Sequence, residues 1–229
     1  MNFGVIVFPG TTGHDDLKYV IESVIDAQYT EIWYETKRLP HVDAIIIPGG
    51  YSFADYLRPG ALASKTGIMQ QVAHFAHKTG IVIGIGNGFQ ILCEANLLPG
   101  TLQMNKNQSF IGKNVFIKAN TNNSALTTLV EKTKVLKLPI AQSYGRYFAR
   151  EEELIMLHQN DLILYRYCDE NGRISMHANP GGSTDNLAAL CNEHRTVYGI
   201  IPHPERACDD ELGNTDGLAI FESIMKWAR

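Results

Sequence analysis

The 229-residue sequence has few cysteines and no long hydrophobic run. Its four cysteines, Cys93, Cys168, Cys191 and Cys208, are scattered, with no C-x-x-C pair and no metal-type spacing with histidine. We therefore expect free thiols in a reducing compartment and no bound metal. No stretch approaches the roughly 18 apolar residues of a membrane-spanning helix, and the opening MNFGVIVFPG is too short and lacks the basic flank of a signal peptide. These absences predict a soluble, cytoplasmic protein.

The sequence also lacks a concentration of basic residues. It contains 20 Lys and Arg against 24 Asp and Glu, for a net charge of -4, and no dense Lys/Arg block. This balance argues against nucleic acid or a membrane as a partner. Hydrophobic residues make up 45% and charged residues 19%, which argues against disorder and a fibrous fold. No repeat, low-complexity stretch or linker divides the chain, so we expect one domain over residues 1–229.

Short apolar runs alternate with helical patterns in the first half of the chain. The runs at 3–8, 31–35, 42–47 and 81–85 predict strands, and apolar spacing predicts helices at 15–27, 67–78 and 89–95. Apolar runs separated by helices are typical of parallel strands covered on both faces. The second half predicts strands at 110–119, 135–140, 162–167, 186–191 and 196–201, and a final helix at 216–227. The expected fold class is α/β, with a mostly parallel sheet and an antiparallel addition.

A glycine-rich segment joins the strand at 81–85 to the helix that follows it. Gly84, Gly86 and Gly88 fit the frame of a nucleophile elbow, G-x-[nucleophile]-x-G, in which a sharp turn lifts one side chain above the sheet. The amides at the start of the next helix would stabilise an oxyanion. Here the elbow position is Gly86, which has no side chain. Taken alone, the segment is equally consistent with a glycine-rich strand-to-helix turn, with or without a bound phosphate, although it is no P-loop.

Two further strand ends carry unusual residues. In Pro202-His203-Pro204-Glu205, residues two apart in an extended segment face the same way, so Glu205 can orient the imidazole of His203. A lone histidine between prolines is more often structural, but its combination with an elbow favours a general-base pair. Pro48-Gly49-Gly50 follows a buried strand, where adjacent glycines form either a plain turn or a site lined by backbone N–H groups.

These segments together resemble the class I, triad-type glutamine amidotransferases. The strings NGFQIL, PHPER and DYLR resemble more specifically the glutaminase subunits of phosphoribosylformylglycinamidine synthase, and the likeness covers nearly the whole chain. The resemblance implies a flavodoxin-like, doubly wound sheet and glutamine as a ligand. It also implies two partners, a synthetase subunit and its small accessory subunit. It implies no cofactor in this chain, because the partner synthetase uses the ATP and Mg.

The resemblance also assigns roles to residues. In this family a cysteine thiolate attacks the glutamine amide, a histidine moves the proton, and water hydrolyses the resulting thioester. By position, His203 would be the base and Glu205 its orienting carboxylate. The backbone N–H groups of Gly50 and Asn87 would stabilise the oxyanion. The predicted substrate-binding residues are Gln90, Gln142, Ser143 and Tyr144.

The chain departs from the family pattern at several positions. Gly86 stands where the nucleophilic cysteine is expected, and removing a triad nucleophile costs on the order of a millionfold in rate. Cys93 lies seven residues along the predicted helix, about 10 Å away, and cannot replace it. Gln142 and Tyr144 replace an expected histidine and glutamate. Cysteines expected near positions 13 and 59 are Gly13 and Pro59.

These departures leave the activity open. An engineered inactive variant would change one position and keep the glutamine pocket, whereas a naturally degenerate relative would change several pocket positions, as here. One hypothesis is a glutaminase subunit that keeps a glutamine-dependent role. The alternative is an inactive docking or regulatory subunit that binds the synthetase. A third hypothesis, a reaction with another nucleophile, would use Ser52, Ser143 or Tyr144. Because glycine tolerates strained dihedrals, Gly86 is expected to preserve the fold.

Overall fold

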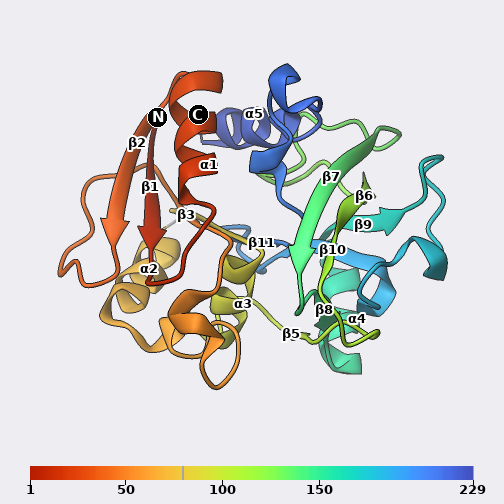
Figure 1. Cartoon of the computed structure of the whole chain (residues 1–229), viewed down its shortest axis with the longest axis horizontal. Coiled ribbons are helices and arrows are strands. Elements are labelled where there is room, and N and C mark those ends of the chain that lie inside the picture. Colours follow the sequence, from red (N-terminus) through yellow and green to blue (C-terminus); the bar gives the residue numbers. More distant parts are fainter. Residues whose placement is uncertain (79, 229) are drawn as a thin grey trace.

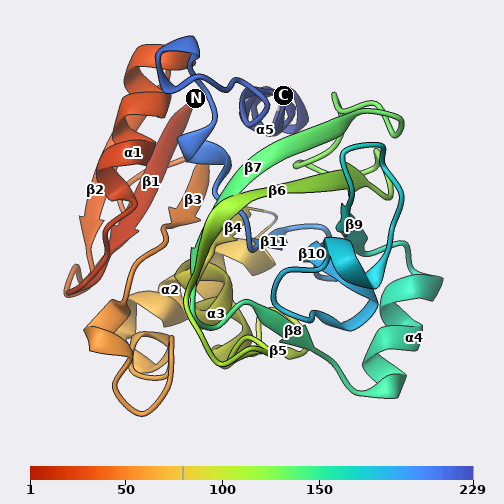
Figure 2. The same ribbon diagram turned by 45° about the vertical axis from the view of Figure 1, so that its right-hand side comes forward.

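The computed structural model describes residues 1–78 and 80–228. Its main feature is a nine-stranded mixed sheet in the order β2-β1-β3-β4-β11-β10-β9-β6-β7 (Figures 1 and 2). The parallel part consists of β2 (Gln28–Trp33), β1 (Asn2–Val7), β3 (Ala44–Ile47), β4 (Ile81–Ile85) and β11 (Val197–Ile200). Its strand order is the doubly wound, flavodoxin-like one, which confirms the predicted fold class.

Helices cover both faces of the parallel strands. Helix α1 (His14–Tyr19) continues into a π-helical turn (Val20–Val24) and links β1 to β2. Helix α2 (Gly67–His77) links β3 to β4, and α3 (Asn87–Glu94) follows β4. The connection from β1 to β2 runs toward one edge of the sheet, and the connection from β3 to β4 runs toward the other. Because such crossovers are right-handed, α1 lies on one face of the sheet and α2 and α3 lie on the other (Figures 1 and 2).

The second half of the chain forms the antiparallel part of the sheet. Its strands are β10 (Leu187–Cys191), β9 (Ile163–Cys168), β6 (Ile111–Ala119) and β7 (Val135–Gln142). Strand β7 buries Leu136, Leu138 and Ile140 and exposes Lys137, which is the alternation of a sheet with one solvated face. The remaining elements are β5 (Thr101–Gln103) paired with β8 (Arg146–Phe148), α4 (Glu151–Gln159) and α5 (Leu218–Trp227).

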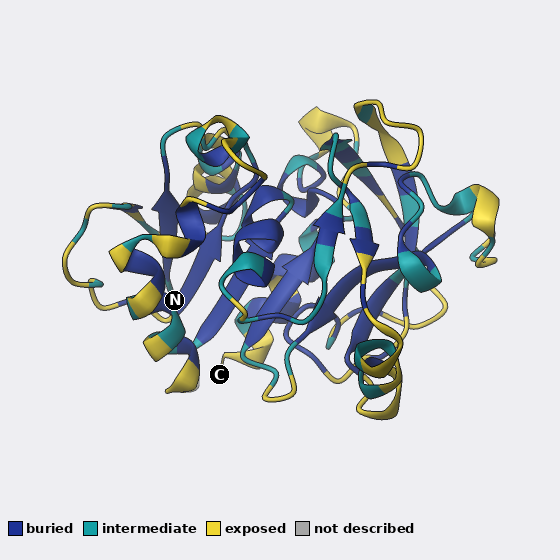
Figure 3. Cartoon of the chain, turned by 90° about the horizontal axis from the view of Figure 1, so that it is seen from below, coloured by how far each residue is buried: buried dark blue, intermediate teal, exposed yellow. Residues whose placement is uncertain are grey.

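The core follows the central strands. Every residue of β3 and β4 is buried, as expected for strands covered on both faces. Figure 3 shows the same distribution, with buried residues along the strands and exposed residues on loops and outer helix surfaces. All four cysteines are buried and free, which confirms the expectation of free thiols. In the described part of the chain, no helix combines the length and hydropathy needed to cross a bilayer.

The structure corrects several predicted elements. The strand expected at 31–35 is β2 at Gln28–Trp33. Strand β2 lies at the edge of the sheet and buries only Ile32, so it has too few apolar residues to predict its bounds. The helix expected at 15–27 ends earlier, in the π-helical turn. Strands β5 and β8 are three residues each and were not predicted. Nor was α4, in which Leu157 alone is buried.

Candidate functional site

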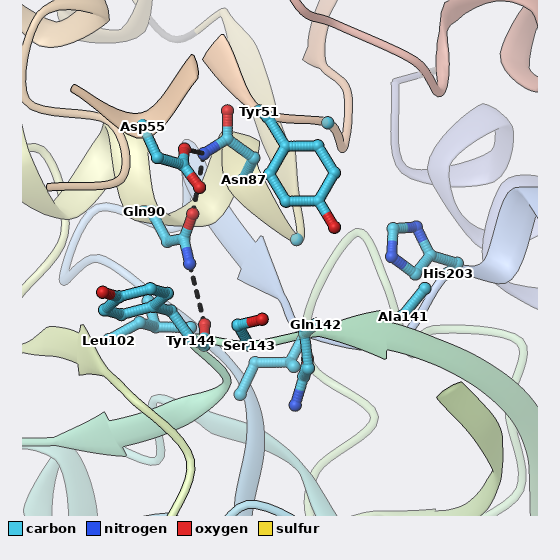
Figure 4. Close-up of a pocket in the computed structure, with 13 residues that line it drawn as sticks. Tyr51, Asp55, Asn87, Gln90, Leu102, Ala141, Gln142, Ser143, Tyr144 and His203 are labelled. Carbon is cyan, nitrogen blue, oxygen red and sulfur yellow. Dashed lines mark hydrogen bonds between the residues drawn. The ribbon is translucent and has the colours of Figure 1, made fainter. Parts of the chain in front are cut away.

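The three strand ends singled out in the sequence meet at one edge of the sheet. Strands β3, β4 and β11 are parallel neighbours, so the segments after Ile47, Ile85 and Ile200 lie side by side. They form one wall of a cavity that the segment after β7 closes from the other side (Figure 4). The lining residues are Gly50, Tyr51, Asp55, Gly86, Asn87, Gln90, Leu102, Ala141, Gln142, Ser143, Tyr144, Ile201 and His203. All predicted site residues except Glu205 are therefore in this lining.

The turn at Gly86 has the sharp geometry expected of a nucleophile elbow. Gly86 adopts φ 54° and ψ −109°, outside the regions that side-chain-bearing residues prefer, and α3 begins at the next residue. Its flanking glycines are required by close packing. A Cβ at Gly84 would lie 2.5 Å from the Gly88 backbone, and one at Gly88 would lie 1.9 Å from the Ile47 carbonyl oxygen. The strand-to-helix turn predicted from the glycine spacing is thus present.

The elbow is directed at the imidazole of His203. A Cβ built on Gly86 would lie 3.1 Å from His203 Cε1 and 3.4 Å from His203 Nε2. A side chain at this position would therefore meet the imidazole directly. The backbone retains the geometry that would present a nucleophile to a base, while residue 86 supplies only hydrogen.

His203 and Glu205 form a buried pair. Nδ1 of His203 lies 2.7 Å from Oε1 of Glu205, and the two residues are 4% and 1% exposed. The predicted pairing is therefore present, although the segment is not extended throughout, because residues 204–206 form a 3₁₀ turn. Arg206 anchors this turn to α1 through a 2.9 Å contact with Asp16. With Nδ1 donating to Glu205, Nε2 is left as the imidazole nitrogen available to the cavity.

The backbone N–H groups of Gly50 and Asn87 are available to bind a ligand in the cavity. The carbonyl of Gly49 accepts hydrogen bonds of 3.1 Å from the amides of Thr12 and Gly13. Because the peptide bond is trans, the N–H of Gly50 points the opposite way. The N–H of Asn87 belongs to the first turn of α3, where it has no intrahelical acceptor. Neither N–H donates to an acceptor within the described residues, so the predicted oxyanion positions offer two unpaired donors.

A hydrogen-bond network holds the side chains of Asn87 and Gln90. Asn87 Nδ2 donates to Gln90 Oε1 at 2.7 Å, and Gln90 Nε2 donates to the carbonyl oxygen of Tyr144 at 2.7 Å (Figure 4). Asn87 Oδ1 accepts from the amide of Ser52 at 3.1 Å. Both ends of the Gln90 carboxamide are therefore paired with protein groups.

The predicted substrate-binding residues Gln142, Ser143 and Tyr144, at the end of β7 and just beyond it, also line the cavity. Gln142 is 9% exposed, and its Nε2 has no hydrogen-bond partner among the described residues. Its carboxamide packs on Gly145, where a Cβ would lie 1.6 Å from Nε2. Ser143 and Tyr144 lie beside it in the lining. The structure thus brings the predicted substrate residues together, and their roles stay a prediction.

Other residues considered from the sequence lie outside the lining. Gly13 supports the Gly49 carbonyl through its amide, and Pro59 is buried. Ser52 is buried with an unpaired hydroxyl among the described residues but does not line the cavity. Cys93 Sγ lies 3.8 Å from the Pro99 carbonyl oxygen, and burial raises its thiol pKa. None of these residues takes the place of a side chain at Gly86.

Sequence reasoning missed five lining residues, which are Tyr51, Asp55, Leu102, Ala141 and Ile201. Asp55 begins the string DYLR, which supported the family resemblance, and Tyr51 lies four residues before it, so this segment was the available signal. Their loop is strained, since Phe53, Ala54 and Asp55 have φ of 53°. Burial raises the pKa of the Asp55 carboxyl to about 6. Leu102 lies on β5, whose three residues give too short a pattern to predict.

The fold and the arrangement of the site are those of a class I glutamine amidotransferase. Residues 1–228 match the CobB/CobQ-like glutamine amidotransferase domain. Phosphoribosylformylglycinamidine synthase subunit PurQ of Aquifex aeolicus is 46% identical over 98% of this chain and 99% of that protein. The subunit PurQ of Koribacter versatilis is 44% identical over 98% and 97%. The chain belongs to the CobB/CobQ-like glutamine amidotransferase family, among the PurQ subunits, which confirms the resemblance.

Solved structures agree with this assignment. A chain in the structure of PurLQS from Thermotoga maritima superposes with a TM-score of 0.87 at 33% identity, covering 100% of this chain and 99% of that chain. A glutamine amidotransferase from the same organism superposes with a TM-score of 0.57 at 12% identity, covering 100% and 91%. The second likeness shows the shared fold alone.

Proposed function

We propose that the chain is the PurQ-type subunit of a phosphoribosylformylglycinamidine synthase and that it assembles with subunits of the PurL and PurS kinds. The similarity to PurQ subunits over 98% of the chain supports this role. So does the TM-score of 0.87 with a chain of a PurLQS structure. In such an assembly the synthetase partner would use ATP and Mg, and this chain would need no cofactor.

We further propose that this subunit does not hydrolyse glutamine through a covalent intermediate. In the family reaction, sulfur attacks the carboxamide carbon, ammonia leaves with a proton from histidine, and water then releases glutamate. The observation that carries the proposal is Gly86 at an elbow whose Cβ position lies 3.4 Å from His203 Nε2. No thioester can form there without a side chain. The expected loss is on the order of a millionfold in rate.

The remaining groups do not compensate for the missing sulfur. His203 and Glu205 still form a base pair, but a base without a nucleophile gains little in a triad site. Ser143 and Tyr144 line the cavity, but they lie on the opposite wall, just after β7. The synthetase would therefore use free ammonia, and this subunit would act by docking on it.

A retained glutamine-dependent role is the second candidate. The buried pair of His203 and Glu205 and the unpaired N–H groups of Gly50 and Asn87 favour it, because a degenerate site has no evident need for them. The two candidates differ in a single observable, the release of glutamate from glutamine within the assembly.

The test is reconstitution with the PurL and PurS proteins of the same organism. We expect the three chains to co-elute in gel filtration, and the complex to form product with ammonium chloride but not with glutamine. Glutamate in the glutamine reaction should stay at the level of a blank without this chain. Failure to co-elute would overturn the docking role. Glutamate release that scales with the amount of this chain would favour the second candidate.

A further inference from the structure

We propose that a groove beside helix α2 binds an organic phosphate of about mononucleotide size. This α2 groove lies between residues 38–42 and the last two turns of α2, and its volume is about 610 Å³. A volume of this order is typical of small-molecule sites. Val42 and Gly80 line the groove close to the first residues of β3 and β4. The groove is therefore at the opposite edge of the sheet from the cavity that contains His203, and its ligand does not depend on the proposed function.

The two walls of the α2 groove are held together by Gln71. Its Oε1 accepts a hydrogen bond from the amide of Leu39 at 2.8 Å, and its Nε2 donates to the carbonyl oxygen of Lys37 at 2.7 Å. The apolar part of the lining is anchored as well. Val42 belongs to the hydrophobic core, and Leu39 and Phe75 pack against that core while partly buried. These contacts fix the shape of the groove before a ligand binds.

Positive charge and hydrogen-bond donors converge on the α2 groove from both walls. Arg38 and His41 come from the segment before β3, and His74 and Lys78 come from the end of α2. Among the described lining residues, no aspartate or glutamate offsets them. The side chains of Arg38, His41 and His74 make no hydrogen bond or ion pair with another described residue. Three of these four side chains are therefore available to a ligand.

The helix macrodipole explains only part of this arrangement. His74 and Lys78 lie at the carboxyl end of α2, where positive charge is stabilising. Arg38 and His41 belong to a different segment, yet they line the same groove. Like charges that share a space without a counter-charge repel each other, and the chain as a whole has a net charge of -4. A bound anion would balance the positive charge that the chain leaves unbalanced in this groove.

The lining favours a phosphate that carries an apolar group. A guanidinium such as that of Arg38 binds two phosphate oxygens at once, and the remaining phosphate oxygens can accept hydrogen bonds from the imidazoles. Imidazoles donate hydrogen bonds whether neutral or protonated. Leu39, Val42 and Phe75 would contact the organic part of the ligand, which inorganic phosphate lacks. A nucleoside monophosphate combines the two features, a dianionic phosphate and a flat ring of low polarity.

Isothermal titration calorimetry of the full chain at equal ionic strength tests the inference with adenosine monophosphate (AMP), adenosine and inorganic phosphate. We expect AMP to bind about tenfold or more tightly than either fragment. Equal affinity for AMP and inorganic phosphate would show that the apolar lining is not used. Equal affinity for AMP and adenosine would show that the cations are not used. Either result, or no binding of AMP, would overturn the inference.

Substitutions of exposed lining residues locate the ligand. Arg38→Gln should weaken AMP binding about tenfold and change adenosine binding little, and His74→Gln should weaken AMP binding about fivefold. His77→Gln is the matched control, because His77 is exposed in the same last turn of α2 but does not line the groove. Unchanged AMP affinity in Arg38→Gln, or an effect of His77→Gln as large as that of His74→Gln, would overturn the inference.

A further variant changes the charge of the α2 groove without changing side-chain size. Gln70 is exposed on α2 and lines the groove, and glutamate is as good a helix former as glutamine, so we expect Gln70→Glu to fold. Its carboxylate would compete with the phosphate for the cations and should weaken AMP binding about tenfold. Gln159→Glu, at the exposed end of α4, is the control and should bind AMP as the native chain does. Unaltered AMP affinity in Gln70→Glu that is folded by circular dichroism would overturn the inference.

Discussion

Replacing Gly86 with cysteine tests how completely the elbow survives. The new Cβ would lie 3.4 Å from His203 Nε2, which brings a thiol within reach of the imidazole. The backbone at φ 54° is unfavourable for any residue with a Cβ, and such strain costs about 1–3 kcal/mol. A chain of this size loses about 2–4 °C in Tm per kcal/mol, so Gly86→Cys should melt roughly 2–12 °C below the native chain.

The introduced thiol should react as a thiolate and support some thioester formation. Full turnover should not return, because Gln142 and Tyr144 still differ from the family pattern in the substrate wall of the cavity. We therefore expect Gly86→Cys in the complex with PurL and PurS to regain only part of the roughly millionfold loss in rate.

The assay is thiol titration with a chromogenic disulfide, followed by glutamate release in the reconstituted complex. The native chain should react slowly with the disulfide reagent, because its four cysteines are buried. Burial raises the pKa of all four, that of Cys168 to about 11 and that of Cys191 to about 12. We expect one fast-reacting thiol in Gly86→Cys and none in the native chain. Gly86→Ala is the control for strain without sulfur.

Two results would refute this reasoning. If the new thiol reacts no faster than the buried cysteines, the elbow does not present residue 86 to His203. If Gly86→Cys reaches the turnover of an ordinary glutaminase of this family, the changes at Gln142 and Tyr144 do not impair the pocket. The second result would leave the missing sulfur as the sole defect.

Two further predictions concern the strained loop beside the cavity. Burial raises the pKa of Asp55 to about 6, so its folded form favours the proton, and stability should fall as pH rises from about 4 to 6. Asp55→Asn should therefore have the higher free energy of unfolding above pH ~6, by about 1 kcal/mol after allowance for solvent screening, and should lose this advantage near pH ~4. Urea titrations at both pH values measure the difference in free energy of unfolding. A higher stability of Asp55→Asn at low pH alone would contradict the prediction. Ala54 lies at φ 53°, so Ala54→Gly should raise the free energy of unfolding by about 0.5–1 kcal/mol, whereas Ala73→Gly in α2 should lower it by a similar amount. A loss of stability in both variants would show that the loop is not strained.

The parallel half of the fold could be predicted because its signals are strong. The strands at β3 and β4 are short apolar runs buried on both faces, and glycine or proline ends each of them. The edge strand β2 was misplaced because it buries Ile32 alone. Helix α4 was missed because Leu157 is its one buried residue, so it has little amphipathic pattern to detect.

The site could be predicted where close backbone packing requires glycine or where residue spacing sets the direction of a side chain. Gly84 and Gly88 are forced by contacts closer than any Cβ allows, and the pairing of His203 with Glu205 follows from two-residue spacing. The contribution of Asp55 could not be predicted, since it depends on a loop with several residues at positive φ. Nor could the pairing of Gln90 with the Tyr144 carbonyl, which joins segments 54 positions apart.

Acid-quenched intact-mass analysis of this subunit, taken from the PurL and PurS complex during incubation with glutamine, tests the absence of a covalent intermediate directly. Because residue 86 offers no sulfur to acylate, the account predicts an unchanged mass for this chain at every time point. A population of the chain heavier by one glutamyl group, on any residue, would contradict it.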